Sequence, residues 1–467
     1  MSEDDVLSRY LTRRDVLRLG VAIGGVAATS AVLAACGASG QTTGPTGAAS
    51  AGPTVGPAAT PAATKAGGKL VIGAFEDGAL APFKSTILPM FQDATGTTVE
   101  FLTEPYDSFF AKAFQDGQSK AGQYDIYIMD DPWIPQYAAA GILEDLGAHG
   151  ITADSDYAPA FAELGYWPPQ QGPRVKGFEN EQPKLIALPT IGDLQTLTFR
   201  NDVFSSAPAT WDDLVAGGKA GVAANKVKYG FVFRGVKGNP IVTSFYPIFL
   251  SFGADMFDDK WNPTFNSTQG KAAADFFVGT LKSIAPPGVA EFDSDQEGAA
   301  ILGGDAAAII QYSGNAIKSD DASASKEVGK LDFGVVPKQE KALAQIGIFI
   351  HGVSASAPNK DNAIAFMKWY GSNETQVALA RSGDLPVKIP AFSDPEAVKA
   401  HRLLPTALAQ VQSGAQARPR TPDWSKVESI LGTELNNALV AGNGGGAAMD
   451  SAAGQVRDYL TTQGYYA

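Results

Sequence analysis

Two adjacent carboxylates and a tryptophan follow directly on a short apolar segment of the chain. Residues Ile126–Met129 have the pattern of a strand that is buried on both faces, and Asp130, Asp131 and Trp133 come immediately after it. Pro132 follows Asp131, which is the pattern of a helix start with Asp131 as its N-cap, so Trp133 is expected in the first helical turn. In open α/β sheets, ligands bind outside the carboxyl ends of the strands. These side chains are therefore candidates for binding a small solute.

The same two acids are poor candidates for catalysis. Two carboxylates that hydrolyse a glycosidic bond flank the sugar from opposite sides, whereas neighbours at one helix start cannot do so. The chain has no Gly-x-Ser-x-Gly motif, one cysteine, and three histidines that stand far apart in the sequence. These features predict neither a hydrolase nucleophile nor a histidine-rich metal site. We expect no enzyme activity, no cofactor and no metal, although a secreted lipoprotein enzyme remains an alternative.

Length and composition fit a globular protein of two lobes with appended segments. The chain has 467 residues, of which 45% are hydrophobic and 18% charged. Its net charge is -13, and no run of lysine and arginine occurs beyond the N-terminal region. Nucleic acid is therefore a poor partner, because binding to it depends on neutralising its phosphates.

The first 36 residues have the pattern of an export signal rather than of a folded element. Arg13 and Arg14 resemble a twin-arginine motif, and an apolar run with several glycines follows them. This run ends at Leu33–Cys36, which is similar to the lipobox of bacterial lipoproteins, and Cys36 is the only cysteine. We expect acylation of Cys36 to anchor the protein to the outer face of the cell membrane, in the periplasm or at the cell surface. The alternative is an ordinary signal peptide.

Residues 37–67 consist almost entirely of Gly, Ala, Ser, Thr and Pro and show no hydrophobic periodicity. This composition is typical of a flexible tether, which would let the globular part stand away from a membrane.

Several segments after residue 68 resemble, in order, the extracellular solute-binding proteins that feed sugar ABC importers, the maltose-binding-like group. They are Asp130 or Asp131 with Trp133 and Ala139–Leu146, then Ile186–Asp202, Ala209–Leu214, Leu331–Pro337, Gly347–Tyr370, Gly383–Val387 and Arg418–Trp424. The resemblance implies an α/β fold, the two-lobed periplasmic-binding-protein type II fold with three hinge crossovers. It places lobe 1 at residues 68–190 and 333–383, and lobe 2 at residues 191–332 and 384–467.

The resemblance also implies a site between the lobes. A sugar offers hydroxyl groups, which need acids, amides or arginine as partners, and C–H faces, which stack on aromatic rings. Arg234 ends an expected strand at Tyr229–Arg234, Tyr312 stands where the family has a large aromatic residue, and Phe349 stands where tryptophan is frequent. The candidate ligand-binding residues are Glu76, Asp77, Tyr106, Asp130, Asp131, Trp133, Arg234, Tyr312, Phe349 and Asp384.

The function that follows from the resemblance is binding of a sugar or polyol and its delivery to the permease subunits of an ABC importer, by a protein that is a monomer. Alternatives that keep the fold have a different ligand, namely a polyamine, ferric iron or a peptide. A further alternative is a sensor protein that binds its ligand without transport. The sequence does not specify the sugar, its size or the importer.

Overall fold

A computed structural model describes residues 67–466. The twin-arginine motif, Cys36 and all but the last residue of the expected tether lie outside the described residues. The export signal, the lipid anchor and the tether therefore remain predictions. No helix within residues 67–466 is both long enough and apolar enough to cross a membrane.

The first sheet has five strands in the order β2-β1-β3-β11-β6. Its strands are β1 (Lys69–Phe75), β2 (Thr98–Glu104), β3 (Ile126–Asp130), β6 (Leu188–Ile191) and β11 (Phe349–Val353). β1 pairs in parallel with β2 and β3, whereas β11 is antiparallel to both β3 and β6. Because β1 and β3 are parallel, their carboxyl ends lie at the same edge of the sheet, and the chain segments after Phe75 and Asp130 meet there.

Helices pack around this sheet and bury one continuous apolar core. They are α2 (Leu80–Pro82), α3 (Leu88–Thr95), α4 (Tyr106–Ser119), α5 (Ile134–Ala139), α6 (Pro159–Ala162), α12 (Lys360–Tyr370), α13 (Asn373–Arg381), α14 (Ile389–Phe392), α15 (Pro395–Ala400) and α16 (Leu404–Ser413). A short antiparallel pair of strands, β4 (Tyr166–Trp167) and β5 (Lys184–Leu185), belongs to the same core.

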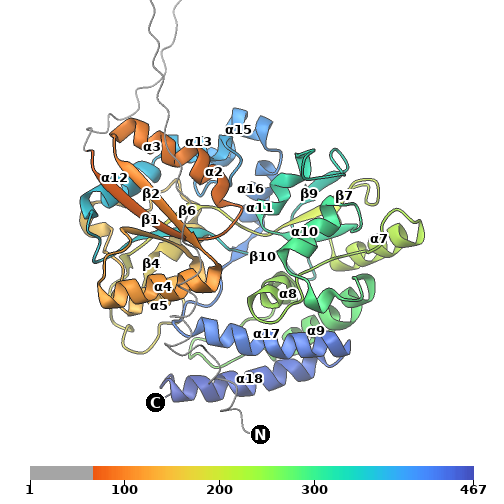
Figure 1. Cartoon of the computed structure of the whole chain (residues 1–467). Coiled ribbons are helices and arrows are strands. Elements are labelled where there is room, and N and C mark those ends of the chain that lie inside the picture. The colour runs from red at the N-terminus through yellow and green to blue at the C-terminus, as the bar shows by residue number, and fades with distance from the viewer. Residues whose placement is uncertain (1–66, 467) are drawn as a thin grey trace, which may run out of the picture. The chain divides into compact units, whose positions relative to one another are not determined.

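The second sheet has three antiparallel strands in the order β8-β7-β9, namely β7 (Thr196–Arg200), β8 (Ala308–Gln311) and β9 (Leu331–Gly334). Its core is separate from the first and is covered by α7 (Trp211–Ala223), α8 (Asn239–Ser251), α9 (Thr268–Asp275), α17 (Trp424–Ala441) and α18 (Gly445–Thr462). α10 (Ser294–Leu302) packs beside β8, and α11 (Ser313–Ala316) follows that strand. In Figure 1, β1 and β2 lie on the left, β7 and β9 on the right, and α17 and α18 side by side at the bottom.

Local sequence signals explain where several of these elements begin. A capping box begins α7, since Thr210 Oγ1 accepts from the N–H of Asp213 and the Asp213 carboxylate accepts from the N–H of Thr210. Trp211, the first residue of α7, is fully buried. The prediction of a strand at Tyr229–Arg234 is wrong. This segment forms no continuous strand pairing and makes only two isolated bridges, from Tyr229 and Val232.

Three connections join the two sheets. The first runs from β6 to β7, and the second runs from β9 to β11 through β10 (Ala344–Gln345). The third was expected at Gly383–Val387, but residues from Leu385 to Ala407 pack in the first core, and their apolar side chains would be exposed if the chain left there. The chain instead leaves through β12 (Ala415–Gln416) and reaches the second core at Trp424. We propose that the lobe boundaries follow these connections.

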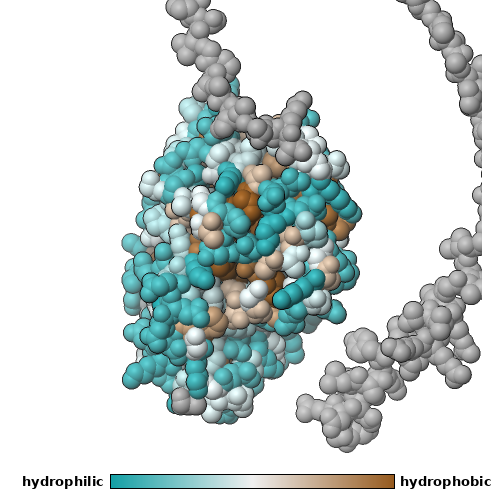
Figure 2. All heavy atoms as spheres, turned by 90° about the vertical axis from the view of Figure 1, so that its left-hand side faces the viewer, coloured by the Kyte–Doolittle hydropathy of each residue, from teal (hydrophilic) through white to brown (hydrophobic). Residues whose placement is uncertain are grey.

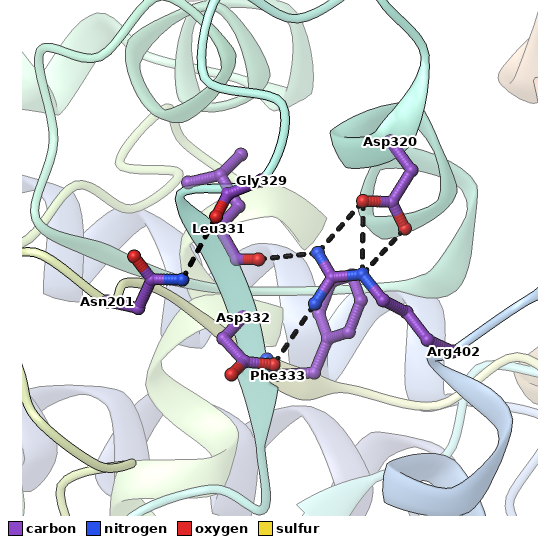
Figure 3. A network of polar contacts seen from close by, with 7 residues as sticks. All are labelled: Asn201, Asp320, Gly329, Leu331, Asp332, Phe333 and Arg402. Carbon is purple, nitrogen blue, oxygen red and sulfur yellow. Dashed lines mark hydrogen bonds and ion pairs between the residues drawn. The ribbon is translucent and has the colours of Figure 1, made fainter.

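An exposed network of polar contacts also joins the two sides of the molecule (Figure 3). Arg402 lies between α15 and α16, which pack in the first core, and its guanidinium donates to Asp320 and to Asp332 of the second sheet region at 2.8–3.1 Å. The guanidinium also lies 4.7 Å from the centre of the Phe333 ring. Because these carboxylates are half exposed, water screens the ion pairs and they contribute little to stability.

The outer surface shows no large apolar area on the face drawn in Figure 2, where hydrophilic side chains surround smaller hydrophobic areas near the middle. The exposed large hydrophobic side chains of the described residues come from separate elements, namely Met90, Leu102, Val222, Val328 and Val440. Such scattered apolar residues are normal on a globular protein.

Candidate functional site

A cavity of about 860 Å³ lies between the loops of the two sheets. The first sheet contributes the segments after β1 and β3, the start of α4 and the start of β11. The second side contributes the segment after β8, the residues before and within α8, and parts of α10 and α17. This volume is in the usual range for small-molecule sites.

Aromatic rings form one wall of the cavity. Trp133 packs against Phe75, Tyr106 and Phe110 with ring centroids 4.7–5.3 Å apart, and Phe75 stacks on Phe349 at 5.2 Å. Trp133 Nε1 donates to Tyr106 Oη at 2.9 Å, and Tyr106 Oη donates to Asp130 Oδ2 at 2.7 Å. Phe75, Trp133 and Phe349 are buried although they line the cavity, and Trp133 is 5% exposed.

Asp130 and Asp131 differ sharply in their surroundings. The structure makes Asp130 the N-cap, because its Oδ1 accepts from the N–H of Asp131 at 2.9 Å, so the cap lies one residue earlier than predicted. Asp130 lines the cavity, whereas Asp131 is 0% exposed and does not line it. The expectation that Asp131 faces the ligand is therefore corrected, because the short helix Asp131–Trp133 turns its carboxylate into the interior.

Arg418, which lies 287 positions after Asp131 in the sequence, bonds to both of these carboxylates. Its Nη2 donates to Asp130 Oδ1 at 2.6 Å and to Asp131 Oδ1, and its side chain is 2% exposed. Burial acts against the charged form of Arg418, but the nearby carboxylates, Asp130 and Asp131 first among them, outweigh it and raise the pKa of the guanidinium well above its ordinary value. Arg418 is therefore a permanent cation at the base of the site.

Arg234 and Tyr312 lie on the second side of the cavity. Arg234 Nε donates to Asp293 Oδ1 at 2.8 Å, and its Nη1 donates to Thr243 Oγ1 at 3.2 Å, so this arginine is held in place by its neighbours. The ring of Tyr312 packs against Gly347, where a Cβ atom would come within 2.5 Å of Tyr312 Cε1. A larger residue at position 347 would push this ring from its place.

Eight of the ten predicted ligand-binding residues line this one cavity. They are Glu76, Asp77, Tyr106, Asp130, Trp133, Arg234, Tyr312 and Phe349. Asp384 does not line it: its side chain is 1% exposed and its Oδ1 accepts from the N–H of Leu385 at 3.0 Å. The chain does not leave the first core at this residue, so the segment is packed inward instead of facing the cavity. That the eight residues bind a ligand stays a prediction.

Other lining residues were missed by the reading of the sequence. Asp193, Glu297, Arg418, Trp424 and Glu428 line the cavity and are buried. Asp193 had a usable signal, since it follows Gly192 in the first connection between the sheets, where the chain passes the cavity. Glu297 and Glu428 had none, because both lie inside helices with the spacing of ordinary amphipathic segments.

Nothing in the described part of the chain forms a group of three or more His, Cys, Asp or Glu side chains that could hold a metal ion. The cavity offers carboxylates, amides, hydroxyls, arginines and aromatic rings. This set can exchange hydrogen bonds with a polar solute and pack against its apolar faces.

Comparison with known proteins identifies relatives of this chain. The profile of the family described as bacterial extracellular solute-binding protein matches residues 73–377. A probable amino-acid ABC transporter periplasmic-binding protein of Sinorhizobium fredii is 26% identical over 395 residues, which are 83% of this chain and 88% of that protein. The mannitol-binding protein of Pseudomonas aeruginosa is 27% identical over 269 residues, 54% of this chain and 57% of the relative.

A solved structure of similar fold is that of maltose-bound T. maritima MalE3, with a TM-score of 0.73 and 21% identity. The similarity covers 84% of this chain and 100% of that structure. The described residues therefore have the two-lobed α/β fold of periplasmic binding proteins.

Proposed function

The chain belongs to the bacterial extracellular solute-binding proteins, and we propose that it binds a sugar or a related polyol in the cavity between its two sheets and delivers it to the permease subunits of an ABC importer. The cavity is the main support for this proposal. It combines aromatic rings with hydrogen-bond donors and acceptors around a space that would hold such a solute. The relatives named for mannitol and maltose support it. We propose further that the protein is a monomer without enzyme activity.

An amino acid, suggested by the name of the Sinorhizobium relative, fits the cavity less well. Its carboxylate would have to bind among nine acidic side chains, against four basic ones, and the two arginines are already engaged, Arg234 by Asp293 and Arg418 by Asp130 and Asp131. A sugar needs no such cation, because hydroxyl groups pair with carboxylates and amides.

A thermal-shift panel tests this function. We expect a sugar or polyol from a set that includes mannitol, ribitol, maltose and maltotriose to raise the melting temperature, since a ligand at 100 times its dissociation constant stabilises the folded state by about 2.7 kcal/mol. Free amino acids and a peptide mixture serve as comparison arms. A shift with these and none with any sugar or polyol would replace the proposed ligand class.

We propose that Cys36, which lies outside the described residues, carries the lipid that anchors the protein to the outer face of the cell membrane. Cys36→Ser is expected to release the protein into the soluble fraction, because this substitution removes the thiol that would be acylated. The measurement is membrane fractionation followed by immunoblotting. The matched control is Ser50→Ala, which changes the same region and keeps the cysteine; a Cys36→Ser protein that stays on the membrane would exclude this anchor.

A further inference from the structure

The cavity contains far more acidic than basic side chains. Nine carboxyl side chains line it, against two arginines and two lysines. The two arginines are already used by carboxylates, since Arg418 pairs with Asp130 and Asp131 and Arg234 pairs with Asp293. The acids that remain have no arginine of the cavity as a partner, so the cavity has an excess of negative charge.

Three of these acids are buried and come from three different segments of the chain. Asp193, Glu297 and Glu428 are 6%, 1% and 8% exposed, and none of them makes an ion pair with another described residue at 4.0 Å or less. The partners of two are neutral: Asp193 Oδ1 accepts from Ser313, and Glu428 Oε1 accepts from Asn239. A buried carboxylate without a counter-charge is costly, so a cation brought by a ligand would stabilise this arrangement.

Of the three acids, Glu297 has the fewest hydrogen-bond partners. Its Oε1 is buried and has no hydrogen-bond partner, and the same holds for Gln311 Oε1, which also lines the cavity. The two oxygens are acceptors that a ligand must reach with N–H or O–H groups, because most buried polar atoms in folded proteins have partners.

The electrostatics of the buried acids agree with this geometry. Burial raises the pKa of Glu297 to about 8, with Arg234 opposing and Asp293 reinforcing the change. Burial likewise raises the pKa of Asp193 to about 7, although its hydrogen bonds to Ser313 act in the opposite direction. Both groups are therefore poorly compensated by the cations that the protein itself supplies.

We propose that the preferred solute is an amine-bearing carbohydrate, a sugar or polyol that carries an ammonium group, and that the buried acids Glu297, Asp193 and Glu428 are the groups available to receive this charge. The inference rests on the proposed function and narrows its ligand class. The aromatic wall around Trp133 takes the C–H faces of the sugar, as for a neutral ligand. The ammonium donates a charge-assisted hydrogen bond to a buried acid, and a neutral sugar can donate only an uncharged one.

Matched pairs of ligands test the proposal by isothermal titration calorimetry. Each pair differs only in an amine: glucamine and glucitol, glucosamine and glucose, and the disaccharide of β-1,4-linked glucosamine and cellobiose. N-acetylglucosamine keeps the nitrogen but not the charge, and putrescine and spermidine keep the charge without the hydroxyl groups. We expect at least one amine-bearing carbohydrate to bind roughly tenfold or more tightly than its neutral partner and its N-acetyl form.

The possible outcomes separate this inference from the proposed function. Equal or tighter binding of the neutral partners would overturn the inference and leave sugar binding intact. Binding of putrescine or spermidine alone would overturn both and indicate a polyamine-binding protein. The absence of binding in every arm would count against both.

Glu297→Gln tests the assigned residue, since glutamine keeps the shape of the side chain and removes its charge. We expect the preference for the amine-bearing member of the pair over its neutral partner to shrink roughly tenfold. Glu396→Gln, an exposed acid at the start of α15, should leave this preference unchanged. Should Glu297→Gln unfold, Glu428→Gln makes the same comparison; an unchanged preference in a folded variant of either acid would overturn the assignment.

Discussion

Arg418→Ala is expected to destabilise the protein by about 3–5 kcal/mol, because it leaves two buried carboxylates without their shared cation. In the folded protein, Asp131 is fully buried, Asp130 is mostly buried, and the guanidinium of Arg418 bonds to both. Removing the partner of a buried charge costs far more than the pair itself contributes, since the desolvation of the remaining groups is no longer offset. Chemical unfolding monitored by circular dichroism measures the loss.

Arg402→Ala is the matched control for this substitution. Arg402 also bonds to two carboxylates, Asp320 and Asp332, but its side chain is 39% exposed and theirs are 45% and 51% exposed (Figure 3). We expect a loss of less than about 1 kcal/mol, since water solvates all three groups after the substitution. Equal losses in the two variants would show that burial is not what makes the Arg418 contacts important.

A combined variant separates lost charge pairing from lost packing. Adding Asp130→Asn and Asp131→Asn to Arg418→Ala removes the uncompensated charges and should recover part of the lost stability. No recovery would indicate that the volume of the Arg418 side chain accounts for the loss, because long side chains also stabilise through their apolar stems.

Trp133→Ala is expected to lower the affinity for the sugar identified in the panel by roughly tenfold to a hundredfold, which corresponds to about 1–3 kcal/mol. The substitution removes part of the wall on which a sugar face would stack, and it removes the N–H that holds the Tyr106 hydroxyl. Because Trp133 is also packed in the first core, the variant should lose about 3–5 kcal/mol of folding stability as well. Titration calorimetry of the folded variant measures the affinity.

Trp211→Ala is the control that separates the loss of affinity in Trp133→Ala from its loss of folding stability. Trp211 is fully buried in the second core, does not line the cavity, and donates from its Nε1 to Ser251 Oγ at 2.8 Å. Its loss should destabilise the protein to a similar extent and leave the affinity unchanged below the melting temperature. An affinity that falls equally in both variants would mean that general destabilisation, not the contact at Trp133, weakens binding.

The elements that position the site could be predicted because local signals mark them. The apolar run of β3 ends at a carboxylate and a proline, and the structure ends the strand at Asp130 and begins the short helix at Asp131. The capping box of Thr210 and Asp213 likewise fixes the start of α7. Such signals involve residues within four positions of each other, so they are readable without knowledge of the fold.

The parts of the site that could not be predicted depend on contacts between distant segments. Whether Asp130 or Asp131 faces the cavity is decided jointly with Arg418, which stands 287 positions from Asp131 in the sequence. Glu297 lies in α10 close to Asp293 and Asp295, which also line the cavity, but only Glu297 is buried, and the packing of α10 near Arg234 decides this. The third connection was displaced in the prediction because the apolar residues after Gly383 fit either core equally well by pattern alone.

The three connections between the sheets are joined to each other by backbone hydrogen bonds. β10 pairs with β12, and Leu194 of the first connection bridges to Ile346 beside β10. A rotation of one half against the other can therefore be taken up by a few torsion angles at the ends of this ribbon while its hydrogen bonds stay intact. Capture and release of a solute would then require no local melting of this ribbon.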